Sequence, residues 1–349
     1  MSMDTLFDSI PTRLLSRLRR LHLAQPPPDP SDDDEAQGST SSPTSHAYEP
    51  SPFDVVVTRV MLGRSMKLPP DLVDCIFDYA EYWAHSSSVV QDIGIVRQNG
   101  RDPNQLLLRS CPLGLTSITG RGSTQIAEEL AYDCSEAKPL PLEREHEPQF
   151  FARLVDYPTP RLLHPCRKIV FTLRSHDQGW GGDQDARGTY RASWTWFEAG
   201  LERFDASQTC DNKCTYDVRS ERPESTAPLL PVCALRPIVP KIEPTGSEPD
   251  SYRYSHKLLH QDELVIQRNK VATRETQEHV VEWSWRDKTD QDSAAARQLD
   301  EQGRGRATGD GTFVRELRLG DVVTVWGKAR FPGWDNYAEL VRIDVYWLV

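Results

Sequence analysis

Apolar and polar residues alternate in many segments of the chain beyond Ser86. Seven segments show this two-residue period and are rich in β-branched and aromatic residues, which is typical of β-strands with one buried face. They span residues 106–115, 167–175, 193–201, 262–271, 279–287, 321–331 and 338–349. No helical pattern of comparable length separates them, so the sequence predicts a mainly β fold, a β-sandwich over residues 89–349.

Two long polar segments interrupt the strand pattern, at about residues 116–150 and 205–258. The second is rich in Pro, Ser and Glu, so we expect it to be a long mobile loop. Between the predicted strands at 279–287 and 321–331, "DSAAARQLDEQG" predicts one short helix that ends at a glycine.

The first 24 residues have a different period. Leucines and an isoleucine recur every three or four positions with arginines between them, which predicts a basic amphipathic helix over residues 1–24. Such a helix suits a targeting or membrane-surface segment, or a terminal helix that docks only weakly. Residues 25–53 are mostly Pro, Ser, Asp and Thr and carry too little apolar surface to fold, so we predict a disordered linker there.

A short helical segment is predicted within residues 54–88. Pro69 and Pro70 suit the start of a helix, and the apolar stripe that follows includes Leu72, Ile76 and Phe77. The stretch "LPPDLVDCIFDYAEYW" resembles the opening of an F-box, and this resemblance implies that the three stripe residues bind a Skp1-type adaptor of a ubiquitin ligase. The same stripe also fits a helix that packs on its own domain.

Charge and cysteine content narrow the choice of partners. A net charge of -11 argues against broad binding of nucleic acid or of anionic membranes, because both depend on Lys and Arg. No apolar run approaches 18 residues, so we predict no transmembrane segment. Seven cysteines without a secretory signal suggest reduced thiols, which favours an intracellular protein, cytoplasmic or nuclear.

One close cysteine pair raises the question of zinc. Cys210 and Cys214 are spaced as zinc ligands are, but a structural site needs two further ligands. The nearest candidates along the chain are Cys233, His256 and His260. Their spacing does not match a zinc motif, so we predict no zinc site.

A second donor group lies in the glycine-rich stretch "HDQGWGGDQDARG". Asp177, Asp183 and Asp185 carry carboxylate oxygens of the kind that Ca²⁺ prefers. Their spacing matches no calcium loop, and the same residues form an ordinary solvated turn. We therefore predict no metal and no cofactor.

Two strands carry a Trp-x-Trp pair, in "SWTWFE" and "EWSW". Alternation places Trp194 and Trp196 on one face of a strand, and Trp283 and Trp285 on one face of another. If these faces point inward, the indoles fill the space between two sheets, which is the more common arrangement. If they point outward, they form an aromatic platform for a sugar or a peptide.

Trp180 and Trp334 lie instead in glycine-containing turns, "GWGG" and "FPGWDN". Binding residues concentrate on loops that a rigid sandwich holds in place. A ligand there would stack on these indoles and form hydrogen bonds with Asp177, Arg330 or Asn336. Alternatively, each indole closes an open end of the sandwich and the polar residues only form turns.

Long stretches resemble a family of fungal proteins without a known activity. The motifs are "KIVFTLRSHDQGWGG", "GTYRASWTWFEAGLERF" and "EQGRGRATGDGTFVRELRLGDVVTVWGKARFPGWDN", and the resemblance covers residues 105–349. A looser resemblance links "VWGKARFPGWDN" to the sugar-binding, galactose-binding-like jelly-roll domain that follows the F-box in some ubiquitin-ligase subunits. Trp326, Arg330 and Phe331 occupy comparable positions, although the family's glycine-histidine pair is missing. The resemblance implies a jelly-roll-like sandwich.

Catalytic motifs are scarce. His176 beside Asp177 suggests acid-base chemistry, but neighbours on a strand point to opposite faces. The chain lacks the nucleophile elbow, the phosphate loop and the zinc-protease motif. The sequence therefore favours a non-enzymatic recognition protein with a carbohydrate or protein ligand, and an adaptor role if the predicted helix recruits a partner. A polysaccharide hydrolase and a scaffold without a ligand are the alternatives.

Overall fold

The computed structural model describes residues 49–98, 103–116, 139–155, 157–208, 232–246 and 250–349. The predicted basic helix at 1–24, most of the predicted linker at 25–53 and the Cys210–Cys214 pair lie outside these residues. In the part of the chain that is described, no helix is both long and apolar enough to cross a membrane.

The first sheet has four antiparallel strands in the order β1-β11-β3-β9. Their side chains alternate between the core and the outside, as in β3, where Ile169, Phe171 and Leu173 are buried. The strands are β1 (Ala84–Arg97), β11 (Asp335–Trp347), β3 (Cys166–His176) and β9 (Gln277–Ser284).

The second sheet has the order β2-β10-β4-β5, with β8 also paired to β4. Its inner face carries Phe197, Val323 and Val325, which join the first sheet's residues in one hydrophobic core. Unlike the first sheet, β4 and β10 are buried on both faces. The strands are β2 (Asn104–Arg109), β10 (Val322–Ala329), β4 (Thr195–Phe204), β5 (Leu235–Val239) and β8 (Val265–Arg268).

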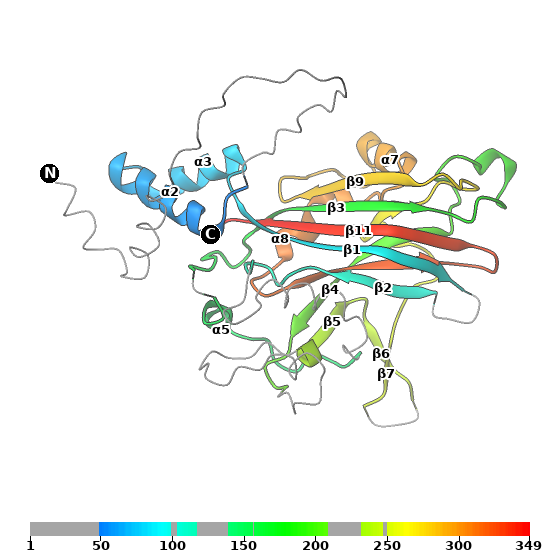
Figure 1. Ribbon diagram of the computed structural model, residues 1–349, viewed down its shortest axis with the longest axis horizontal. Coiled ribbons are helices and arrows are strands. Elements are labelled where there is room, and N and C mark those ends of the chain that lie inside the picture. Colours follow the sequence, from blue (N-terminus) through cyan, green and yellow to red (C-terminus); the bar gives the residue numbers. More distant parts are fainter. Residues whose placement is uncertain (1–48, 99–102, 117–138, 156, 209–231, 247–249) are drawn as a thin grey trace, which may run out of the picture. The chain divides into compact units, whose positions relative to one another are not determined.

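The two sheets face each other as layers, with β1, β11, β3 and β9 above and β2, β4 and β5 below in Figure 1. The predicted mainly β fold is confirmed, and each of the seven predicted segments contains a strand. The finer expectation of a jelly-roll topology stays a prediction.

The sandwich begins earlier than expected, at Ala84 rather than residue 89. The alternation in β1 is hidden by three consecutive serines and by a bulge between Gln91 and Gly94, which shifts the register. The polar segment at 205–258 also contains strands that its prolines concealed: β5, and the two-stranded β6 (Ile242–Pro244) and β7 (Tyr252–Tyr254). Proline is tolerated there because these strands lie at sheet edges.

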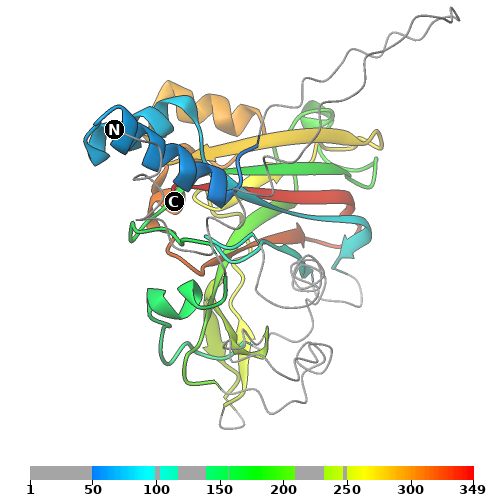
Figure 2. The ribbon, with the colours of Figure 1, turned by 60° about the vertical axis from the view of Figure 1, so that its left-hand side comes forward.

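Two helices precede the sandwich, α2 (Pro52–Ser65) and α3 (Pro70–Ala80). Ser51 and Asp54 form a capping box that starts α2 inside the region expected to be linker. Both helices lie at the end of the sandwich where β1 begins (Figures 1 and 2). Three shorter helices occur later in the described chain: α5 (Pro148–Ala152), α7 (Ala294–Glu301) and α8 (Thr312–Glu316).

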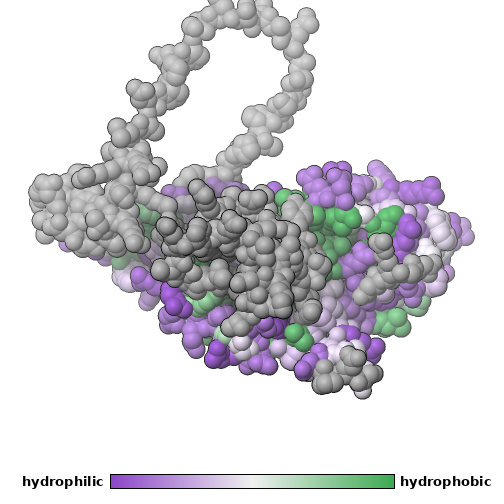
Figure 3. Space-filling view, turned by 60° about the horizontal axis from the view of Figure 1, so that its bottom comes forward, coloured by the Kyte–Doolittle hydropathy of each residue, from purple (hydrophilic) through white to green (hydrophobic). Residues whose placement is uncertain are grey.

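The side of the molecule that bears α5 and β5 to β7 is mainly hydrophilic where it is coloured, with smaller hydrophobic areas between (Figure 3).

The α7 helix confirms the short helix predicted before a glycine, because Gly303 follows it with φ 84°.

Candidate ligand-binding site

Three loops meet at one end of the sandwich. The β3–β4 and β8–β9 loops are joined by reciprocal backbone hydrogen bonds, in which the Gly188 N–H donates to Val271 O and the Val271 N–H donates to Thr189 O, both at 2.8 Å. The β10–β11 loop joins them where the Arg330 N–H donates to Trp194 O at 2.9 Å. The two turns that the sequence singled out, around Trp180 and Trp334, therefore lie at the same end.

Asp177 holds this end together. Its buried carboxylate accepts hydrogen bonds from the backbone N–H groups of Gly179 at 2.7 Å, Ala272 at 2.6 Å and Thr273 at 2.8 Å. Burial raises the pKa of this carboxyl, and the three N–H donors act in the opposite direction. The side chain predicted to bind a ligand is thus occupied by the β8–β9 loop.

Trp180 is the most exposed aromatic residue of this end, with 57% of its surface accessible. Its loop is fixed, since the Gln178 side-chain amide donates to Trp180 O at 2.6 Å and accepts from the Asp335 N–H at 3.2 Å. Gly333 adopts φ 88°, and a Cβ there would lie only 3.1 Å from the indole, so glycine favours this close approach of the two loops.

Phe331 adds a second exposed ring, with 38% of its surface accessible. It packs edge-on against Trp194 at a centroid distance of 4.7 Å. Trp334 is partly exposed, and its ring would lie 3.7 Å from a Cβ on Gly182. We call Trp180, Trp194, Phe331 and Trp334 the aromatic end. Phe331 was not predicted as a ligand residue, although "ARFPGW" places it beside the turn.

The backbone at the aromatic end adopts conformations that non-glycine residues rarely take. Ala192, Ala272 and Phe331 have φ values of 55°, 55° and 65°. Each costs on the order of 1–2 kcal/mol and persists only where the surroundings hold it. Such strain is typical of loops that present side chains in a fixed orientation.

Asn336 lies beneath the loops and is fully buried. Its amide donates to Trp196 O at 3.1 Å and to Lys328 O at 3.3 Å, and its carbonyl oxygen accepts from Asn269 Nδ2 at 2.9 Å. These bonds join β11 in the first sheet to β4 and β10 in the second. The structure therefore places this predicted ligand residue inside the sandwich.

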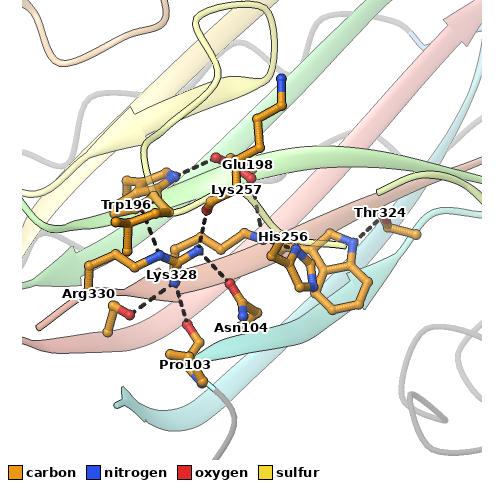
Figure 4. Close-up of polar contacts among 12 residues, drawn as sticks. Pro103, Asn104, Trp196, Glu198, His256, Lys257, Thr324, Lys328 and Arg330 are labelled. Carbon is orange, nitrogen blue, oxygen red and sulfur yellow. Dashed lines mark hydrogen bonds and ion pairs between the residues drawn. The ribbon is translucent and has the colours of Figure 1, made fainter. Parts of the chain in front are cut away.

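Arg330 is also buried, on the outer face of the second sheet (Figure 4). Its guanidinium donates to the carbonyls of Lys257 and Leu258, both at 3.0 Å, and lies 5.0 Å from the ring of Trp196. These contacts fix residues 252–260 across the sheet, so Arg330 acts as an internal anchor. Only Trp180 and Trp334 of the five predicted ligand residues reach the surface.

A charged cluster lies beside Arg330. The Lys328 ammonium, 1% exposed, is 3.3 Å from a Glu198 carboxylate oxygen and 2.5 Å from His256 Nδ1 (Figure 4). Burial and the charges of Lys328 and Arg330 lower the pKa of His256 to about 3. The imidazole is therefore neutral near pH 7 and accepts a hydrogen bond from the lysine.

The Trp-x-Trp pairs divide between two environments. Trp283 packs in the core against Phe171 at 5.0 Å, as expected. Trp196 is also buried, but on the outer face of the second sheet rather than between the sheets. Residues 254–258, the end of the segment expected to be a long mobile loop, lie against that face. Trp194 and Trp285 are partly exposed.

The His176–Asp177 pair does not form a catalytic unit. His176 Nδ1 lies 2.6 Å from the backbone oxygen of Asp177, and its ring stacks on Tyr337 at 4.5 Å. The Asp177 carboxylate points to the β8–β9 loop instead. Within the described ranges, no group of three or more His, Cys, Asp or Glu residues is arranged to hold a metal ion.

The predicted partner helix corresponds to α3, and its three named residues point in different directions. Leu72 and Ile76 are 52% and 42% exposed. Phe77 is 1% exposed and packs in the core, 5.7 Å from the ring of Tyr82. Tyr79, which the sequence analysis did not name, is 88% exposed on the same helix.

Comparisons of the chain with protein-family models, with curated proteins and with solved structures gave no match. The resemblances to the fungal family, to the F-box and to the sugar-binding domain therefore stay predictions, and the geometry above carries the functional argument.

Proposed function

We propose that this protein is a recognition module that binds a carbohydrate at the aromatic end. The exposure of Trp180 carries the proposal, because a rigid loop presents more than half of a large indole to solvent. Burying an indole on folding is favourable, so a fixed and exposed one is typical of a binding surface.

The surroundings of the indole suit a sugar. Asp183, Asp185 and Arg187 are exposed on the same loop and offer hydrogen-bond acceptors and donors to a ligand. Carbohydrate sites combine a flat apolar surface with a few polar groups of this kind. A protein ligand would use the same ring as an anchor, and the test below separates the two.

Replacing the exposed indoles tests this proposal. In a glycan-array measurement, the wild type binds a subset of glycans, and Trp180→Ala and Trp334→Ala each weaken that binding about tenfold or more. Tyr79→Ala is the control, because it removes an even more exposed ring, at 88%, from α3. Wild-type binding by both folded indole variants, or no bound glycan at all, contradicts the proposal.

A second candidate function concerns α3. Leu72, Ile76 and Tyr79 recur every three or four residues and are all exposed, so they form an apolar stripe on the side opposite Phe77. Such a stripe fits a partner helix, as the F-box resemblance would require. We therefore propose, as a second function, that this exposed stripe on α3 recruits a Skp1-type adaptor.

Co-purification with Skp1 tests the adaptor role. We expect the wild type to co-purify and Leu72→Asp to lose the partner, because a charge is buried in the contact. Leu163→Asp is the control, since Leu163 is also exposed, at 64%, but lies far along the chain. The role is excluded if Skp1 does not co-purify, or binds both variants equally.

A further inference from the structure

A pocket of about 320 Å³ lies beside α5, at the opposite end of β10 from the aromatic end. Gly320 and Asp321 line it just before β10, whereas Phe331 follows that strand. Eight strand residues separate the two sites by roughly 25 Å. The pocket is therefore independent of the proposed carbohydrate site, and its size is at the lower limit for a small-molecule site.

Apolar side chains form much of the pocket wall. Phe151 and Phe204 belong to a second hydrophobic cluster beneath it, and Leu162 and Leu163 stand exposed beside it, at 42% and 64%. Gly320 adopts φ 88°, and a Cβ there would collide with the ring of Phe151. The glycine thus lets this ring lie close to the chain and form part of the wall.

Two arginines that line the pocket are already paired with carboxylates. Arg203 donates to both carboxylate oxygens of Asp321 at 2.8 and 3.2 Å and to Glu145 at 2.9 Å. Arg318 donates to the other oxygen of Glu145 at 2.8 Å. Because each guanidinium already faces a carboxylate, this wall is held rigid and adds little net charge.

Arg161 differs from these two arginines. It lines the pocket, is exposed, and makes no ion pair within the ranges that the structure describes. It directly precedes Leu162 and Leu163, so a free guanidinium stands beside exposed apolar side chains. Guanidinium groups bind carboxylates with two parallel hydrogen bonds.

The other charges restrict the anion. Glu145 and Asp321 are already paired with arginines, whereas Glu147, which also lines the pocket, is exposed and makes no ion pair among the described residues. Its charge disfavours a dianion such as a phosphate monoester, so Arg161 suits an anion with a single charge. His146 stacks on Phe150 at 3.8 Å, and burial together with Arg144 lowers its pKa, so it offers a flat neutral ring. We propose that this pocket binds a small monocarboxylic acid with an apolar body, whose carboxylate pairs with Arg161.

Matched acids and alcohols test the proposal. By isothermal titration calorimetry on the full chain, we expect octanoate or phenylacetate to bind, and 1-octanol or 2-phenylethanol to bind about tenfold more weakly. Arg161→Gln should weaken the binding of the acid to the level of the alcohol and leave the alcohol unchanged. Leu163→Asn should weaken both.

Arg174→Gln is the control, because it removes an exposed guanidinium from the first sheet. Circular dichroism checks that each variant is folded, which is expected since Arg161 and Leu163 are exposed. Three results would overturn the proposal: neither acid binds, the alcohols bind as tightly as the acids, or Arg161→Gln binds the acid like the wild type. None of them bears on glycan binding at Trp180.

Discussion

At the scale of single residues, partly buried histidines beside positive charges are a source of pH sensitivity. Lys328 and Arg330 face His256, and Lys270 and Arg304 face His279. Burial and these charges lower the pKa values of the two histidines from 6.5 to about 3 and about 4. Both therefore bind a proton less readily in the folded chain than in the unfolded chain.

The free energy of unfolding should fall on acidification. Stability is fully present above pH 6.5 and is lost as the pH falls toward 4, because protons then favour the unfolded chain. Urea unfolding at pH 7 and pH 5 should show a loss of about 1–2 kcal/mol per histidine. The double variant His256→Gln, His279→Gln should lose correspondingly less, and an unchanged loss would show that other groups cause it.

The sequence could not reveal that the polar residues predicted to bind a ligand form hydrogen bonds within the protein instead. Asp177, Arg330 and Asn336 stand beside aromatic turns, which is why they were candidates for a ligand site. Their hydrogen-bond partners are distant in the sequence. Asp177 binds Ala272, 95 residues away, Arg330 binds Leu258, 72 residues away, and Asn336 binds Asn269, 67 residues away. Aromatic residues in glycine turns gave the better signal, because such turns have to reach the surface.

At the scale of elements, α3 combines a buried and an exposed apolar face. One carboxylate, that of Asp78, fixes the buried face: it accepts from Trp83 Nε1 at 3.0 Å and from Arg167 Nε at 2.8 Å. Arg167 begins β3, so these bonds tie the helix to the first sheet. The sequence predicted the helix from its period, but a period does not show which of two apolar faces is buried.

Removing this carboxylate should destabilise the protein. Asp78→Ala leaves the buried guanidinium of Arg167 without its ion pair and the Trp83 indole N–H without an acceptor, which costs about 2 kcal/mol. Thermal and urea unfolding measure the loss. Asp71→Ala on the same helix is the control, because Asp71 is exposed, and equal effects of both variants would contradict this role for Asp78.

At the scale of the whole molecule, one sheet is open and the other is covered. The first sheet alternates buried and exposed residues, so the sequence predicted its strands well. The central strands of the second sheet, β4 and β10, are buried on both faces, and Arg330 and Lys328 bind the covering segment through Leu258 and His256. Proline and polar residues dominate that segment, so the sequence predicted a free loop.

The indole N–H signals of the tryptophans test the proposed function most directly. A glycan that binds on the array is titrated into the ¹⁵N-labelled full chain, with each signal assigned by replacing one tryptophan. The account predicts that the signals of Trp180 and Trp334 shift in proportion to bound glycan, while those of the buried Trp196 and Trp283 stay in place. Shifts confined to the buried indoles, or unchanged signals for Trp180 and Trp334 at saturation, would contradict it.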